Sequence, residues 1–156
     1  MPVIIMRGLP GSGKTTKARD IHETWTDGPS LIVSADDYFT CSKCTHYDFK
    51  PEIIGQAHTD CFRKALMFLQ EYQKEQLPLL IIDNTNIRAW EFQPYVALAG
   101  AFRQGVRTML VECPIDVSIE RNTHGVPPEI VEKMSEAFEP PTPGLAQEVI
   151  PYVPSE

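Results

Sequence analysis

Short runs of apolar residues recur along the chain, separated by longer stretches in which apolar residues have helical spacing. None of the runs alternates cleanly between apolar and polar residues, which predicts strands buried on both faces of a parallel sheet. We expect four such strands, at residues 3–6, 30–33, 79–82 and 106–111. The pattern predicts helices between them, at residues 14–26, 51–75 and 88–103.

This alternation of strands and helices predicts an α/β fold. Crossovers between parallel strands are right-handed and place helices on both faces, so we expect a three-layer sandwich around a mainly parallel sheet of four to five strands. A chain of 156 residues suits a single domain. Because ligands of open parallel sheets bind beyond the carboxyl ends of the strands, the residues directly after each strand are the first candidates for a site.

The segment after the first predicted strand, residues 8–15, reads Gly-Leu-Pro-Gly-Ser-Gly-Lys-Thr and fits the phosphate-loop pattern G-x-x-x-x-G-K-[ST]. A predicted strand precedes it and a predicted helix follows, as the motif requires. The backbone N–H groups of such a turn surround a phosphate, Lys14 would reach the β- and γ-phosphates, and the Thr15 hydroxyl would bind Mg²⁺. The sequence therefore predicts a nucleoside triphosphate site, made by Gly8, Pro10, Gly11, Ser12, Gly13, Lys14, Thr15 and Thr16.

Acidic residues follow the second and third predicted strands. A kinase needs a carboxylate that accepts the proton of the attacking hydroxyl, and Asp36 is the candidate for this general base. Capping of the next turn is the alternative for Asp36 and Asp37. Asp83 follows four apolar residues in a Walker B-like pattern, which predicts a second Mg²⁺ ligand beside Thr15.

These motifs together resemble the polynucleotide 5′-hydroxyl kinase family of P-loop kinases. Within that family, the residues are most similar to the P-loop kinase-like domains of ubiquitin-ligase-binding proteins. The matching elements occur in the family's order over nearly the whole chain. They are residues 8–15, 36–38, 82–86, 121–127 and 138–142.

The resemblance implies transfer of the γ-phosphate of ATP to a 5′-hydroxyl of DNA or RNA, with Mg²⁺ as the metal. It also implies that Asp36 is the general base and that Arg121 is an arginine of a short lid at about residues 120–128. The chain departs from the phage-type kinases at Phe39, where they carry an arginine that contacts the acceptor phosphate, and at His124, the nearest counterpart of their second lid arginine. The candidates for acceptor binding are Asp37, Phe39, Asn84, Asn86, Arg88 and His124.

Other interpretations remain open at this point. A small-molecule kinase acting on a nucleoside or another metabolite alcohol would use the same motifs, and so would a nucleotide-binding module that controls a partner. Cys41 and Cys44 form a single C-x-x-C, which fits either a structural metal site or loop thiols.

The formal charge of −7 argues against a nucleic-acid partner, but its distribution weakens the objection. Residues 127–156 contribute six glutamates against Lys133, so the rest of the chain is close to neutral. We therefore expect weak, salt-sensitive and end-directed binding of nucleic-acid 5′ ends.

The C-terminal region also differs in composition, because residues 127–156 hold seven of the 14 prolines. This predicts an extended, proline-rich tail at residues 139–156 that packs on a core formed by residues 1–138. No apolar run is long enough to cross a bilayer, and the N-terminus has no signal-peptide pattern. A cytoplasmic or other reducing intracellular compartment is therefore expected.

Overall fold

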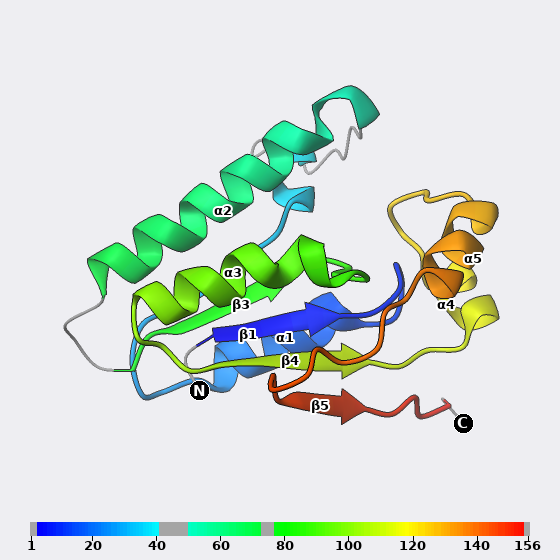
Figure 1. Cartoon of the computed structure of the whole chain (residues 1–156). Helices are drawn as coiled ribbons and strands as arrows, with labels where there is room; N and C mark the ends of the chain where they lie inside the picture. Colours follow the sequence, from blue (N-terminus) through cyan, green and yellow to red (C-terminus); the bar gives the residue numbers. More distant parts are fainter. Residues whose placement is uncertain (1–2, 41–49, 73–76, 155–156) are drawn as a thin grey trace.

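The computed structural model describes residues 3–40, 50–72 and 77–154. A five-stranded sheet, parallel throughout, forms its centre, with the strand order β2-β3-β1-β4-β5 (Figure 1). This confirms the predicted α/β class, and the four predicted strands lie within one residue of their expected bounds. The strands are β1 (Val3–Arg7), β2 (Ser30–Val33), β3 (Leu79–Asp83), β4 (Val106–Val111) and β5 (Gln147–Ile150).

Helices cover both faces of the sheet. One face is covered by α1 (Lys14–Thr24), and the other by α2 (Ile54–Glu71) and α3 (Ala89–Ala101) (Figure 1). The helix predicted at residues 51–75 begins later than expected, because Pro51–Ile53 forms the 3-10 helix η2. Its predicted end lies partly outside the described residues, which stop at residue 72 and resume at residue 77.

Three further short helices lie beyond the carboxyl ends of the strands. The 3-10 helix η1 (Asp36–Phe39) follows β2, and α4 (Ile115–Arg121) and α5 (Pro128–Glu136) follow β4. Figure 1 shows α4 and α5 side by side past the tips of β1 and β4. The hydrophobic pattern did not indicate either helix.

The sheet has a separate hydrophobic core on each face, which explains why its strands do not alternate between apolar and polar residues. Ile5 of β1 faces α2 and α3, where it packs in one cluster with Phe68 and Phe92. Ile4 and Met6 of the same strand face α1 and pack in a second cluster that includes Ala18. Both faces of β1 are therefore buried, as a parallel sheet between helices requires.

The C-terminal region is tied to the centre of the sheet by Arg7, the last residue of β1, which is 1% exposed. Its guanidinium lies between the rings of Phe92 and Phe138, with its central carbon 5.0 and 4.8 Å from their centres. It donates hydrogen bonds of 2.8–3.0 Å to the backbone oxygens of Asn86, Ile87 and Glu139 and to Oε1 of Gln147. The proline-rich region thus contains a strand, β5, which pairs with β4 and is held by a buried arginine.

None of the helices in the described part of the chain combines the length and apolar character needed to cross a membrane.

Candidate active site

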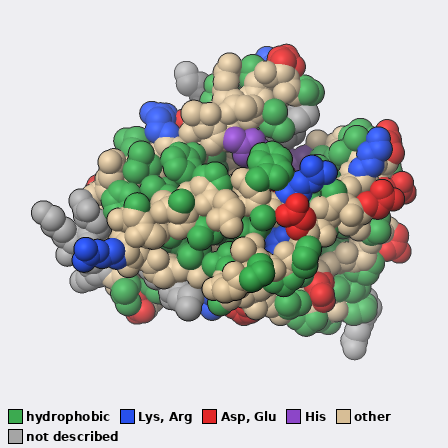
Figure 2. Space-filling model, in the orientation of Figure 1, with side chains coloured by type: hydrophobic (Ala, Val, Ile, Leu, Met, Phe, Trp, Pro, Cys, Tyr) green, Lys and Arg blue, Asp and Glu red, His purple; other side chains and the backbone are tan. Residues whose placement is uncertain are grey.

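A cavity of about 590 Å³ opens at the carboxyl edge of the sheet. Figure 2 shows the surface hollowed between the part that carries α2 and the part that carries α4 and α5. The lining comes from the phosphate loop with the start of α1, from the segments that follow β2 and β3, from the start of α2, and from residues 121–134, which include most of the expected lid. It brings together most of the residues that the sequence assigned to nucleotide binding, namely Pro10, Gly11, Gly13, Lys14, Thr15, Thr16 and Arg121.

Two glycines of the phosphate loop differ in whether neighbouring atoms, as well as the backbone angles, exclude a larger residue. Gly11 has a φ of 78° and Gly13 a φ of 98°, both in the region that favours glycine. A Cβ on Gly11 would overlap the backbone oxygen of Ser118 in α4, whereas a Cβ on Gly13 would meet nothing within 4 Å. The loop is therefore packed against α4 at Gly11 and open toward the cavity at Gly13.

Lys14 is buried inside the loop, and its Nζ donates a hydrogen bond of 2.7 Å to the backbone oxygen of Leu9. Burial lowers the pKa of Lys14 to about 8, although the carboxylates of Asp83 and Asp36 act in the opposite direction. An anionic phosphate bound in the loop would favour the charged ammonium.

Thr15 and Asp83 lie together, as expected for a metal site. The Thr15 hydroxyl donates a 2.7 Å hydrogen bond to Oδ2 of Asp83, while Oδ1 of Asp83 is buried and has no hydrogen-bond partner among the described residues. Burial raises the pKa of Asp83, and the hydrogen bond from Thr15 opposes this shift. A buried carboxylate oxygen with unused acceptor capacity, next to a hydroxyl oxygen, fits a hard divalent cation such as Mg²⁺.

Asp36 lines the same cavity as the phosphate loop, with 49% of its side chain exposed. It is the first residue of η1, and Asn84 fixes the residue before it: the Ala35 N–H donates a 2.9 Å hydrogen bond to Oδ1 of Asn84. The amide nitrogen of Asn84 lies 3.7 Å from the sulfur of Cys61 on α2. The side chain of Asn84 therefore joins the ends of β2 and β3 to α2.

The lid is attached to the phosphate loop through α4. The hydroxyl of Ser118, which is fully buried, donates to the backbone oxygen of Pro10. Asn122 then closes the turn that follows: its Nδ2 donates a 2.7 Å hydrogen bond to the oxygen of Val126, and its Oδ1 accepts a 3.1 Å hydrogen bond from the N–H of His124. Sequence patterns did not identify Ser118, because a serine in a short helix has no distinguishing spacing.

Arg121, the last residue of α4, lines the cavity, and its guanidinium carbon lies 5.6 Å from the ring centre of Tyr152. This contact connects the lid to the segment that follows β5.

Of the six candidates for acceptor binding, the structure brings three into the cavity lining: Phe39, Asn84 and His124. Phe39 is 5% exposed and packs with Ala35 and Ala57, so it forms part of an apolar wall. Three cavity residues that the sequence did not single out extend this apolar surface: Ile54, Ile130 and Met134.

The other three candidates lie outside the lining. Asn86 is 2% exposed and donates a 2.7 Å hydrogen bond from Nδ2 to the oxygen of Met6, so its side chain joins the segment after β3 to β1. Arg88 is exposed at the start of α3, where its N–H donates to Oε2 of Glu91. Asp37 lies on η1 with much of its surface exposed, and partial desolvation of its carboxyl raises its pKa.

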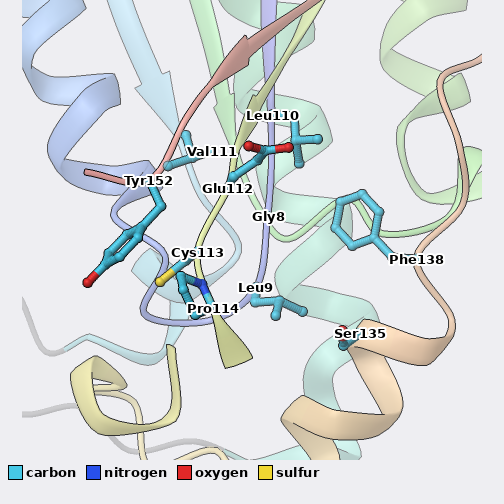
Figure 3. A pocket seen from close by; sticks show the side chains of 10 residues that line it. All are labelled: Gly8, Leu9, Leu110, Val111, Glu112, Cys113, Pro114, Ser135, Phe138 and Tyr152. Atoms are coloured by element: carbon cyan, nitrogen blue, oxygen red, sulfur yellow. The ribbon is translucent and has the colours of Figure 1, made fainter. Parts of the chain in front are cut away.

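Two residues of the phosphate loop also lie outside this lining. Gly8 borders a second, smaller cavity of about 410 Å³, in which Figure 3 shows Tyr152 and Phe138 on opposite sides of the loop's start. Ser12 is buried, and its hydroxyl has no hydrogen-bond partner among the described residues.

The possible metal site at Cys41 and Cys44 lies outside the described residues. Within residues 3–40, 50–72 and 77–154, no group of three or more His, Cys, Asp or Glu side chains is arranged to hold a metal ion.

The parallel sheet, the phosphate loop and the lid define a P-loop kinase-like nucleotide-binding domain. Residues 3–141 match the family described as an AAA domain (AAA_33), and the chain belongs to this family. Human NEDD4-binding protein 2 is 36% identical over 143 residues, which is 88% of this chain and 8% of that protein. The chain thus corresponds to a small part of this relative.

Solved structures share the fold at low sequence identity. Kti12 from Chaetomium thermophilum, in complex with ADP-AlF3, is 16% identical with a TM-score of 0.67 over 95% of this chain and 89% of that one. A chain of the Pnkp1/Rnl/Hen1 RNA repair complex is 21% identical with a TM-score of 0.68 over 88% of this chain and 43% of that one.

Proposed function

We propose that the chain is an ATP-dependent kinase that transfers the γ-phosphoryl group to a 5′-hydroxyl of DNA or RNA. The observation that carries this proposal is the position of Asp36, a half-exposed carboxylate that lines the same cavity as Lys14 and Arg121. A carboxylate in the same cavity as a phosphate loop is suited to accept the proton of a hydroxyl that attacks the γ-phosphorus in line.

Each side chain around the cavity has a distinct part in this reaction. Lys14 and the loop N–H groups bind the phosphates, and Arg121 donates hydrogen bonds to the equatorial oxygens as charge develops on them. Thr15 and Asp83 would hold Mg²⁺, which supplies further neutralisation of the phosphate charge when bound. Asp36 accepts the proton as the acceptor oxygen forms its bond to phosphorus.

Two further observations support a nucleic-acid acceptor. Phe39, Ile54 and Ile130 offer apolar surface around the cavity that Asp36 also lines, and such surface suits the base or sugar of a terminal nucleotide. One structure with the same fold belongs to an assembly named for RNA repair.

A transfer assay with γ-labelled ATP tests the proposal. DNA and RNA oligonucleotides with a 5′-hydroxyl should become labelled, and the same oligonucleotides with a 5′-phosphate should not. Label found only on nucleosides or sugar alcohols would identify a small-molecule kinase, and nucleotide binding without any transfer would favour a regulatory module.

The variant Asp36→Asn tests the assigned base. It should lower transfer by about 10²- to 10⁴-fold while ADP binds with unchanged affinity. Asp37→Asn is the matched control, because this neighbouring carboxyl lies outside the cavity lining and its loss should leave transfer largely intact. Equal losses in the two variants would argue against Asp36 as the base.

A further inference from the structure

His124 of the lid and Asp36 of η1 approach each other across the cavity. The Nε2 atom of His124 lies 3.9 Å from Oδ2 of Asp36, and the two side chains are 38% and 49% exposed. Both residues line the cavity, yet they belong to elements on opposite sides of it. The contact is therefore made by the tertiary structure.

The lid holds the backbone of His124 in a closed turn. The His124 N–H donates to Oδ1 of Asn122, whose Nδ2 in turn donates to the oxygen of Val126, so the turn is closed on both sides of the histidine. Gly125 allows this turn through its φ of 68°. Ser118 attaches the preceding helix to the phosphate loop, so the turn that carries His124 is tied to that loop.

The distance between the two side chains fits one oxygen atom. A separation of 3.9 Å is too long for a direct hydrogen bond, but it is less than two hydrogen-bond lengths, so an oxygen atom about 2.8 Å from both atoms is geometrically allowed. A carboxylate only accepts hydrogen bonds, whereas an imidazole protonated at Nε2 donates one. A hydroxyl group satisfies both neighbours at once, since it donates one hydrogen bond and accepts another.

We propose that His124 orients the attacking oxygen: Nε2–H donates to that oxygen while its own O–H donates to Oδ2 of Asp36. In the transfer step the oxygen–phosphorus bond forms, the bond from the γ-phosphorus to the bridging oxygen of ADP breaks, and the hydroxyl proton passes to Asp36. His124 keeps its proton throughout. The inference rests on the proposed phosphoryl transfer but not on the identity of the acceptor, because a water molecule in the same place would be the attacking oxygen of ATP hydrolysis.

The test compares His124→Ala with His124→Gln, because glutamine restores an N–H donor without the ring. His124→Ala should lower kcat/KM for a 5′-hydroxyl oligonucleotide about 10- to 100-fold and the rate of ATP hydrolysis by a similar factor. The affinity for ADP, measured by calorimetry, should not change, and His124→Gln should recover part of both rates. His22→Ala is the matched control, because His22 lies on α1 outside the cavity, where it hydrogen-bonds Ser30.

Three results would overturn the role of His124: unchanged rates in His124→Ala, a parallel loss of ADP affinity, or no difference between the alanine and glutamine variants. If the wild-type protein hydrolyses ATP but labels no oligonucleotide, the proposed acceptor is wrong, and the hydrolysis rates alone decide the role of His124. A wild-type protein with neither activity would overturn both proposals.

Discussion

The backbone N–H of Ala35 donates a 2.9 Å hydrogen bond to the side-chain oxygen of Asn84. Asn84 directly follows β3, and Ala35 directly precedes Asp36, so this bond sets the position of the proposed base from a neighbouring strand. Ala35 is 7% exposed, and little water can replace the bond if it is lost.

Replacing Asn84 by alanine should therefore affect both stability and catalysis. We expect Asn84→Ala to lower the free energy of unfolding by about 1–3 kcal/mol, because it leaves a buried N–H without a partner. Phosphoryl transfer should fall more than ADP affinity, since Asp36 loses its support while the phosphate loop is untouched. Urea unfolding, transfer rates and calorimetry measure these three quantities.

Gln56→Ala is the control for this prediction, because it removes only an exposed 3.3 Å hydrogen bond from the Tyr38 hydroxyl. Its effect on stability should stay within about 0.5 kcal/mol. Transfer at the wild-type rate by Asn84→Ala would show that Asp36 is held by other contacts.

The two loop glycines at residues 11 and 13 should respond differently to the same substitution. Gly13→Ala meets only the cost of a positive φ, about 1–2 kcal/mol, because nothing lies within 4 Å of the added carbon. Gly11→Ala meets that cost and also collides with the backbone of α4, which adds about 1–3 kcal/mol. Thermal unfolding without nucleotide compares the two variants, and equal melting temperatures would contradict the close packing of α4 on the loop.

The affinity for ADP should depend on pH through Lys14. Burial lowers the pKa of this lysine to about 8, so a growing fraction loses its proton as the pH rises above that value. Phosphate binding favours the charged form, so binding takes up a proton and the affinity should fall with rising pH, at most about tenfold per pH unit. Above about pH 8, Lys14 loses its proton in the folded protein but keeps it in the unfolded chain. The free energy of unfolding of the protein without nucleotide should therefore rise with pH in this range.

Calorimetry of ADP binding in the presence of a chelator, at several pH values from about 7 to about 9, tests this dependence. Lys17→Met should keep it, because Lys17 is a surface residue paired with Asp20, whereas Lys14→Met should remove it. An affinity that does not change with pH would mean that Lys14 remains charged in the free protein.

Arg7 should be one of the most sensitive positions for stability. Arg7→Met removes four hydrogen bonds to β5 and to the segments around residues 86 and 139, and leaves several acceptors unpaired. We expect a loss of at least about 3 kcal/mol in the free energy of unfolding, measured in urea. Arg107→Met is the matched control on β4, because its ion pair with Glu148 is partly exposed and contributes at most about 1 kcal/mol.

Features that depend only on residues close together in the chain could be predicted from the sequence. The phosphate loop needs glycines at particular positions and a lysine and threonine next to them, and all of these are contiguous. The strands could be predicted as well, because burial on both faces produces unbroken apolar runs such as residues 79–82. Local sequence also placed Asp36 and Asp83 at the carboxyl edge, where both line the cavity.

Contacts between distant segments could not be predicted in this way. Asn84 and Asn86 are two residues apart and of the same type, yet one lines the cavity and the other is buried against β1. The strand β5 lies in a proline-rich region with only four residues in the ladder, and its place in the sheet depends on β4 and Arg7. The hydrophobic pattern carries no information on which distant partner a polar side chain will meet.

The sequence alone determined the α/β class, the phosphate loop and the acids that follow β2 and β3, because each depends on residues adjacent in the chain. Only the tertiary structure decided that α4 packs against Gly11, that Asn84 supports Ala35, and that His124 lies 3.9 Å from Asp36. Those relationships depend on how strands and helices pack, and a buried donor or acceptor is paired by whichever partner the packing brings within hydrogen-bond distance.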